Sequence, residues 1–284
     1  MTMKKLLLLC TILAAASCSP KIFSIVQIAD AQLGFDAAVK GQEPGATYVN
    51  DLTYEKECFE RAAESIRGLK PDMIVFTGDQ IHRTLDQEQW DTFNDLLALL
   101  PSDSKVMHLP GNHDVLISEG KVDNTPFTSR YGSDRFVYNV GKFCMIGINS
   151  NLIKYDDPGE EEQFQWLKTT LEQLGESAVK VIFCHHPFFL TDIDEEDSYF
   201  PIQKAKRKRY FDLFADYGVS AVFAGHRHDT YEGEYRGVRM QTATSVAYQI
   251  GEAKPSFRFI MLSTRRDHAP VQDMMVVVTA QDSL

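Results

Sequence analysis

The chain has 284 residues, of which 44% are hydrophobic and 24% are charged. This balance is typical of a globular protein, and the length suffices for one large domain with a substantial core without requiring a second domain. The formal net charge of -11 argues against a general nucleic-acid binder, because such proteins usually present a basic face to the phosphates.

The first residues have the pattern of an export signal. Two lysines precede an apolar run at residues 6–16, which is too short to span a bilayer but suits the centre of a secretory signal peptide. Three small residues then stand directly before Cys18, as in a bacterial lipobox. The pattern predicts a lipoprotein-type signal peptide at 1–17 and a lipid anchor on Cys18. The protein is then exported and tethered to a membrane of the bacterial cell envelope, either in the periplasm or at the surface. A plain signal peptide cleaved nearby is the alternative.

The later cysteines do not suggest a disulfide framework or a zinc cluster. Cys58, Cys144 and Cys184 are odd in number and have no metal-like spacing. Cys144 and Cys184 lie in apolar, strand-like runs, so we expect them to be small core residues.

Hydrophobic periodicity predicts alternating strands and helices in the first half of the chain. Strands are expected at 22–30 and 72–79 and at the start of 105–114, with amphipathic helices at 52–68 and 86–99 between them. This order of elements implies a parallel sheet.

The second half adds more strands and two further helices. The expected elements are strands at 135–140 and 142–149, a helix at 160–174, a strand in 179–187, a helix near 203–217, a strand in 219–229, and short strands at 230–235, 238–244, 257–263 and 274–280. We expect this mixture to form two packed sheets flanked by helices.

Five of the apolar strands end in residues that can bind a metal. In VFTGDQIH, residues 75–82, an apolar run stops at Thr-Gly-Asp and is followed three positions later by a histidine. The five pairs are Asp30 and Gln32, Asp79 and His82, Asn112 and His113, His185 and His186, and His226 and His228. One such pair alone fits a helix cap or a turn. Five strand ends of an open α/β sheet can instead converge on one crevice, so the sequence predicts a metal site.

The order of these motifs resembles that of a known superfamily. GDQIH, LPGNHD, CHHP and AGHRH, after an initial Asp-x-Gln, resemble the calcineurin-like metallophosphoesterase superfamily over residues 30–228. VQIADAQLGF and SVAYQIGE are also similar to the branch typified by the calcineurin-like phosphoesterase domain-containing protein 1, which is associated with phosphoprotein phosphatase activity. The resemblance implies an α/β four-layer fold, a β-sandwich of two mixed sheets flanked by helices, and one such domain at 18–284.

Carried over by position, the resemblance implies a site for two divalent metal ions. Asp79 would bridge the ions, because each of its two carboxylate oxygens can bind one cation. The remaining ligands would be Asp30 and His228 for the first ion, and Asn112, His185 and His226 for the second. Gln32 stands where the superfamily usually has a histidine, and its amide oxygen can coordinate more weakly. Mixed oxygen and nitrogen ligands suit Mn, Fe, Zn or Co and do not identify the ion.

Four more residues are expected beside the metals. The resemblance makes His113 the general acid that protonates the departing alkoxide. Asp114 either orients His113 or begins a helix. His82 has three open roles: a metal ligand that compensates for Gln32, a hydrogen-bond partner of His113 or of the substrate, and a passive loop residue. His186 either faces the substrate phosphate or supports a neighbouring ligand through a hydrogen bond.

The resemblance also implies the reaction. A metal-bridging hydroxide would attack phosphorus in a phosphoric ester. We favour a phosphomonoesterase that acts on a phosphorylated small molecule or a phosphoprotein. One alternative is a phosphodiesterase on small diesters, which would use the same metals. The other is a noncatalytic, metal-binding surface lipoprotein.

Specificity is expected to come from the segment 188–210, which leaves the strand that carries His185 and should lie over the metals. It contains an acidic run at 192–197, which would disfavour crowded anions, and a basic run at 204–209. The basic run could meet a phosphorylated substrate or an anionic membrane, or it could be a solvated helix face.

Overall fold

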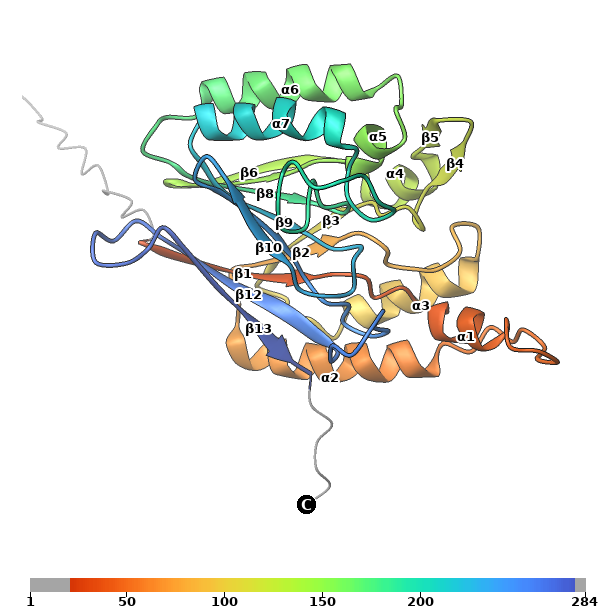
Figure 1. Ribbon diagram of the computed structural model, residues 1–284. Helices are drawn as coiled ribbons and strands as arrows, with labels where there is room; N and C mark the ends of the chain where they lie inside the picture. Colours follow the sequence, from red (N-terminus) through yellow and green to blue (C-terminus); the bar gives the residue numbers. More distant parts are fainter. Residues whose placement is uncertain (1–20, 279–284) are drawn as a thin grey trace, which may run out of the picture.

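Two mixed β-sheets packed face to face form the centre of the computed structural model, which describes residues 21–278 (Figure 1). The first sheet has the order β13-β12-β1-β2-β3, and the second has the order β10-β11-β9-β8-β7-β6. The strands of the first sheet are β1 (Ile22–Ile28), β2 (Met73–Thr77), β3 (Lys105–Leu109), β12 (Ser256–Ser263) and β13 (Val271–Val277). Those of the second are β6 (Phe136–Val140), β7 (Phe143–Gly147), β8 (Val179–Cys184), β9 (Val219–Ala224), β10 (Glu232–Tyr235) and β11 (Val238–Thr242).

Each sheet combines parallel and antiparallel pairs. β1, β2 and β3 are parallel to one another, and β12 and β13 extend the sheet antiparallel. In the second sheet, β7, β8, β9 and β11 are parallel, whereas β6 and β10 pair antiparallel with their neighbours. The carboxyl ends of the parallel strands therefore lie at one end of the sandwich, as predicted.

Helices cover the outer face of each sheet, which confirms the predicted four layers (Figure 1). The first sheet is covered by α2 (Thr53–Leu69) and α3 (Gln87–Leu97), and the second by α6 (Glu160–Gln173) and α7 (Lys204–Asp216). Short elements complete the fold: α1 (Phe35–Lys40), α4 (Thr125–Tyr131), α5 (Ser150–Lys154), and the two-stranded β4 (Leu116–Ser118) and β5 (Lys121–Asp123).

Alternation along the strands distributes the apolar residues among three layers of core. In β1, Ile25 faces the space between the sheets, where it belongs to one cluster with Phe183 of β8. The next residue, Val26, faces the opposite way and packs with Phe59 of α2. Successive side chains of a strand point to opposite faces, so central strands covered on both sides read as continuous apolar runs. The three described cysteines are buried and free, as expected.

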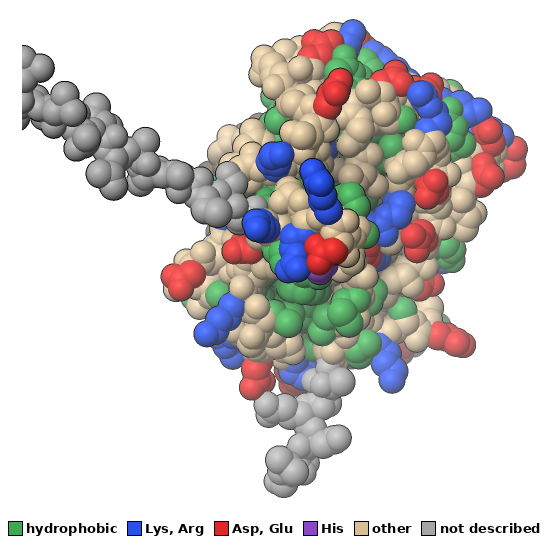
Figure 2. All heavy atoms as spheres, turned by 90° about the vertical axis from the view of Figure 1, so that its left-hand side faces the viewer, with side chains coloured by type: hydrophobic (Ala, Val, Ile, Leu, Met, Phe, Trp, Pro, Cys, Tyr) green, Lys and Arg blue, Asp and Glu red, His purple; other side chains and the backbone are tan. Residues whose placement is uncertain are grey.

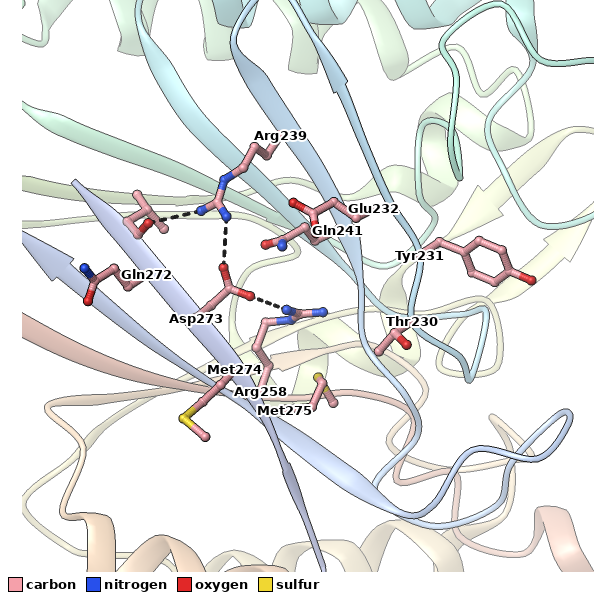
Figure 3. A pocket seen from close by; sticks show the side chains of 11 residues that line it. Thr230, Tyr231, Glu232, Arg239, Gln241, Arg258, Gln272, Asp273, Met274 and Met275 are labelled. Carbon is pink, nitrogen blue, oxygen red and sulfur yellow. Dashed lines mark hydrogen bonds and ion pairs between the residues drawn. The ribbon is translucent and has the colours of Figure 1, made fainter. Parts of the chain in front are cut away.

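An ion-pair network joins the open edges of the two sheets (Figure 3). Asp273 of β13 accepts hydrogen bonds from Arg258 of β12 and from Arg239 of β11, the latter at 3.2 Å. Arg258 also donates to the carbonyl of Thr242 in β11 at 2.6 Å. Arg239, Arg258 and Asp273 line a cavity of about 660 Å³. The two guanidinium groups are bound to a carboxylate and to backbone carbonyls, so the network links one sheet to the other.

The predicted signal peptide at 1–17 and Cys18 lie outside the described residues. Within residues 21–278, no helix has the length and apolar character needed to cross a membrane. On the face at the left of Figure 1, Lys and Arg side chains are interspersed with Asp and Glu, so neither sign of charge dominates this face (Figure 2).

Candidate metal centre

The five predicted strand ends meet at one end of the sandwich, on the side of α1 in Figure 1. β1, β2 and β3 of the first sheet lead to Asp30, Asp79 and Asn112, while β8 and β9 of the second sheet lead to His185 and His226. Four of these side chains are almost completely buried, and Asn112 is half-buried. The site is thus shared between the two sheets.

Three potential ligand atoms gather around one nitrogen of His185, which is itself a fourth. Its Nε2 lies 3.0 Å from Asn112 Oδ1, 3.1 Å from His226 Nδ1 and 3.3 Å from Asp79 Oδ2. One ring nitrogen cannot form good hydrogen bonds to all three atoms at once. A cation surrounded by oxygen and nitrogen donors would use all four of them.

A second group lies next to the first. Asp30 Oδ1 is 3.5 Å from His228 Nε2 and 3.9 Å from His185 Nδ1. The Asp30 carboxylate also accepts the backbone N–H of His226 at 3.0 Å. Asp30, Asp79 and His185 together bring three ligand atoms within 4.8 Å of one another. Asp79 therefore lies near both Asp30 and the group around His185, as a carboxylate that binds two cations would.

Backbone carbonyls fix the orientation of three imidazoles. The Nδ1 atoms of His185, His228 and His113 lie 2.9, 2.6 and 2.8 Å from the carbonyl oxygens of Thr77, Tyr248 and His82, respectively. A carbonyl can only accept, so each Nδ1 carries a proton, and Nε2 is the nitrogen of each ring that can bind a metal ion or a second proton. In metal sites this arrangement orients a ligating histidine.

Strained backbone is concentrated at the same place. Nine described residues other than glycine have positive φ, and five of them are candidate ligands: Asp30, Gln32, Asp79, His226 and His228. Such conformations cost about 1–3 kcal/mol each and persist where the surrounding structure enforces them, often at functional sites.

Two glycines allow the loops to approach the carboxylates. A Cβ added to Gly111 would lie 2.1 Å from Asp79 Oδ1, and one added to Gly225 would lie 2.7 Å from Asp30 Oδ2. Any other residue at 111 or 225 would displace a candidate ligand.

The charges of the site favour the binding of a cation. Burial alone would lower the pKa of His185, but the carboxylates of Asp79 and Asp30 raise it to about 9. Burial would likewise raise the pKa of Asp79, but the imidazoles of His185 and His113 hold it below its ordinary value. A metal ion would supply the positive charge that these carboxylates attract.

Three buried polar atoms of the predicted site residues also lack a protein partner. Gln32 Oε1, His82 Nδ1 and His186 Nε2 make no hydrogen bond within the described structure. His186 brings a ligand atom within 4.8 Å of those of His185 and His226. Unpaired buried polar atoms are costly, and a metal ion or a bound substrate would satisfy them. The residues present thus fit divalent cations.

The structure shows contacts of His82 and Asp114 for which the sequence left several roles open. The carbonyl of His82 accepts from His113, and the two rings stack with their centroids 4.8 Å apart. Asp114 accepts backbone N–H groups of Gln80 and Gly111 at 3.0 and 2.8 Å, so it joins two loops and makes no hydrogen bond to the His113 ring. No helix begins at Asp114.

The sequence did not indicate a role for Ser150, which supports His185 and His186. Ser150 follows β7, and its hydroxyl accepts the backbone N–H groups of His185 and His186 at 3.1 and 2.8 Å. It also lies 3.3 Å from His186 Nδ1. β7 is a sixth strand with polar residues at its carboxyl end, so the rule that found the other five ends applies to it as well.

Comparisons with known proteins agree with this geometry. The family model described as calcineurin-like phosphoesterase matches residues 23–230. A serine/threonine-protein phosphatase CPPED1 from Bos taurus is 30% identical over 258 residues, which cover 86% of this chain and 81% of that protein.

Solved structures share the fold. A dimetal phosphatase from Danio rerio superposes with a TM-score of 0.57 and 17% identity, and covers 90% of this chain and 99% of its own. The purple acid phosphatase PPD1 from yellow lupin superposes with a TM-score of 0.62 and 12% identity, over 89% of this chain and 54% of its own. The chain therefore belongs to the calcineurin-like phosphoesterase family, whose members are metal-dependent hydrolases of phosphoric esters.

Proposed function

We propose that the protein is a phosphomonoesterase that uses two divalent metal ions at this centre. The observation that carries the proposal is the convergence of nitrogen and oxygen donor atoms around His185 Nε2. Asp30 and His228 would hold one ion, and Asn112, His185 and His226 the other, with Asp79 between them. Gln32 and His186 have the unpaired atoms that could complete the two sets.

The residues of the chain have separate tasks in the proposed reaction. Two bound cations would supply a water of lowered pKa and would neutralise charge on the phosphoryl oxygens. His113 would hold a proton at Nε2 for the departing oxygen, because its Nδ1 is bound to the carbonyl of His82. The backbone N–H of His113 donates to Asp79 at 2.9 Å, which fixes the acid relative to the metal ligand.

The substrate is proposed to be a phosphorylated small molecule or a phosphoprotein. The printed name of the Bos taurus relative, a serine/threonine-protein phosphatase, supports a monoester of this kind. Hydrolysis of small diesters would require the same ligands, so the test below includes a diester.

Export and lipid anchoring through Cys18, within a bacterial cell envelope, belong to the same proposal. They rest on the sequence pattern before Cys18 alone.

The function is tested with the mature chain, stripped of metal and reconstituted with Mn. We expect p-nitrophenyl phosphate to be hydrolysed faster than bis(p-nitrophenyl) phosphate. His113→Ala should lower kcat about 10²- to 10⁴-fold, the usual contribution of a general acid, without changing the bound Mn measured by elemental analysis. Asp79→Asn should lose both activity and metal.

His268→Ala serves as the control, because His268 lies in the loop before β13 and pairs only with Asp267 among the described residues. Faster turnover of the diester would replace the proposal with a phosphodiesterase, and metal-loaded protein inactive on both esters would favour the noncatalytic alternative. Loss of Mn from His113→Ala would overturn the role given to His113.

A further inference from the structure

Basic and acidic residues of the segment 188–210 form ion pairs with each other. Lys204, Arg207 and Lys208 of α7 pair with Glu196, Asp197 and Asp194 at 3.0, 3.4 and 2.7 Å. The other two basic residues of the run, Lys206 and Arg209, pair with Glu160 and Glu161 of α6. All five basic residues of the run are thus ion-paired, so the basic run is not a free cationic patch for an anionic substrate or membrane.

The same segment is fastened to α5 and α7 through its backbone. Lys154, the last residue of α5, donates from Nζ to the carbonyls of Tyr199 and Pro201 at 2.7 and 2.6 Å. Its own carbonyl accepts from Gln203 at 2.6 Å. The completely buried guanidinium of Arg207 donates to the carbonyl of Ile202 at 2.8 Å and to that of Glu195 at 2.6 Å. The path of the segment is therefore fixed.

This anchorage places aromatic rings beside the metal ligands. The rings of Tyr199 and Phe200 both have centroids 5.6 Å from that of His226. Tyr155, directly after Lys154, meets His186 edge-on at 5.8 Å. Burial and then the Asp79 carboxylate raise the pKa of Tyr199, and burial, then Tyr199 and Asp79, raise that of Tyr155 to about 12. Both phenols thus lie within electrostatic reach of Asp79.

Tyr199 is the accessible member of this group. It is 68% exposed although its ring lies next to a buried imidazole, whereas Tyr155 is half-buried. An exposed aromatic ring beside a buried polar site offers a flat apolar surface to a substrate bound there. Aromatic rings stack best on other planar groups.

We propose that Tyr199 is the specificity-determining residue of the site and stacks on a planar, uncharged organic group of the substrate, such as an aryl ring. The preferred substrate class is then an aryl phosphomonoester, with the phosphoryl group among the metal ligands and the ring against Tyr199. This inference rests on the proposed phosphomonoesterase activity and deepens it.

The test compares p-nitrophenyl phosphate with 2-phosphoglycerol on the Mn-loaded mature chain, its Tyr199→Ala variant and its Tyr199→Phe variant. Aromatic stacking contributes about 0.5–1.5 kcal/mol, which corresponds to roughly 2- to 12-fold. We expect Tyr199→Ala to lower kcat/KM for the aryl ester by about 3- to 10-fold, mainly through KM, and to change that for the alkyl ester less than about twofold. Tyr199→Phe should retain the wild-type ratio, because it keeps the ring.

The two proposals fail in different ways. If the wild type hydrolyses both esters but Tyr199→Ala affects them equally or not at all, Tyr199 does not select the substrate, and the phosphomonoesterase activity stands. If the wild type hydrolyses neither, both proposals are overturned.

Phenylphosphonate and methylphosphonate provide a second measurement as competitive inhibitors. Only the inhibition constant of phenylphosphonate should rise in Tyr199→Ala, and an equal rise for both would contradict the inference.

Discussion

His82 holds His113 in two ways. Its carbonyl fixes the Nδ1 proton of His113, and its ring stacks on the imidazole at 4.8 Å and contacts the tilted ring of Phe35 at 5.1 Å. The first contact belongs to the backbone and survives any substitution, whereas the second needs a flat ring. Its Nδ1 is buried and has no hydrogen-bond partner among the described residues. The contacts of His82 with His113 thus support a positioning role, while this nitrogen leaves metal ligation open.

Substitution of His82 separates the open roles. If the ring only positions His113, His82→Phe should retain kcat within about threefold, while His82→Ala should lower it by about 3- to 10-fold, the equivalent of a lost aromatic contact. Bound Mn, measured by elemental analysis after dialysis, should be equal in both variants and the wild type. Loss of Mn from His82→Phe as well as from His82→Ala would instead identify His82 as a metal ligand.

At the scale of single elements, long periodic segments were predictable and short ones were not. The predicted helix at 52–68 corresponds to α2 and the one near 203–217 to α7, because each repeats its apolar positions over several turns. α1 and α5 have six and five residues. Helices that short are unstable alone and form through tertiary contacts, which periodicity does not reveal. The strand ends that hold the site were predictable because parallel strands share one carboxyl end.

The contacts of the segment 188–210 could not be predicted for a different reason. The basic run of α7 has five charged residues of one sign within six positions, and nothing in the run marks Arg207 as different. Only the path of residues 192–202 over α7 buries this side chain and provides the carbonyls it binds. The same path decides that Tyr199 reaches His226. The burial of Arg207 and the contact between Tyr199 and His226 both depend on the loop conformation.

This difference between neighbouring arginines can be measured. Arg207→Met should lower the free energy of unfolding by about 2–4 kcal/mol, because it leaves the buried carbonyl of Ile202 and the half-buried carbonyl of Glu195 without donors. The same substitution at Arg209, whose side chain is 43% exposed and pairs with Glu161, should cost less than about 1 kcal/mol. Urea denaturation of both variants gives the comparison. Equal losses would show that the buried contacts of Arg207 do not anchor the segment.

For the whole molecule, the metal centre is also a junction between the sheets. Asp30, Asp79 and Asn112 come from the first sheet, and His185 and His226 from the second. The Asp273 network joins the same sheets at the β10–β13 edges. An ion that needs ligands from both sheets binds only when the sandwich is assembled, so metal binding and folding are coupled.

Removal of metal should therefore destabilise the entire domain. A ligand that binds only the folded state adds about 4 kcal/mol at a free concentration of 1,000 times its Kd, so Mn should raise both the urea midpoint and Tm in a concentration-dependent way. His113→Ala should respond to Mn as the wild type does, because the proposed acid is not a ligand. Asp79→Asn should respond little, because it lacks the carboxylate between the two groups of donors. If Mn stabilised Asp79→Asn as much as the wild type, the ion would be bound elsewhere, and the assignment of ligands from both sheets would be wrong.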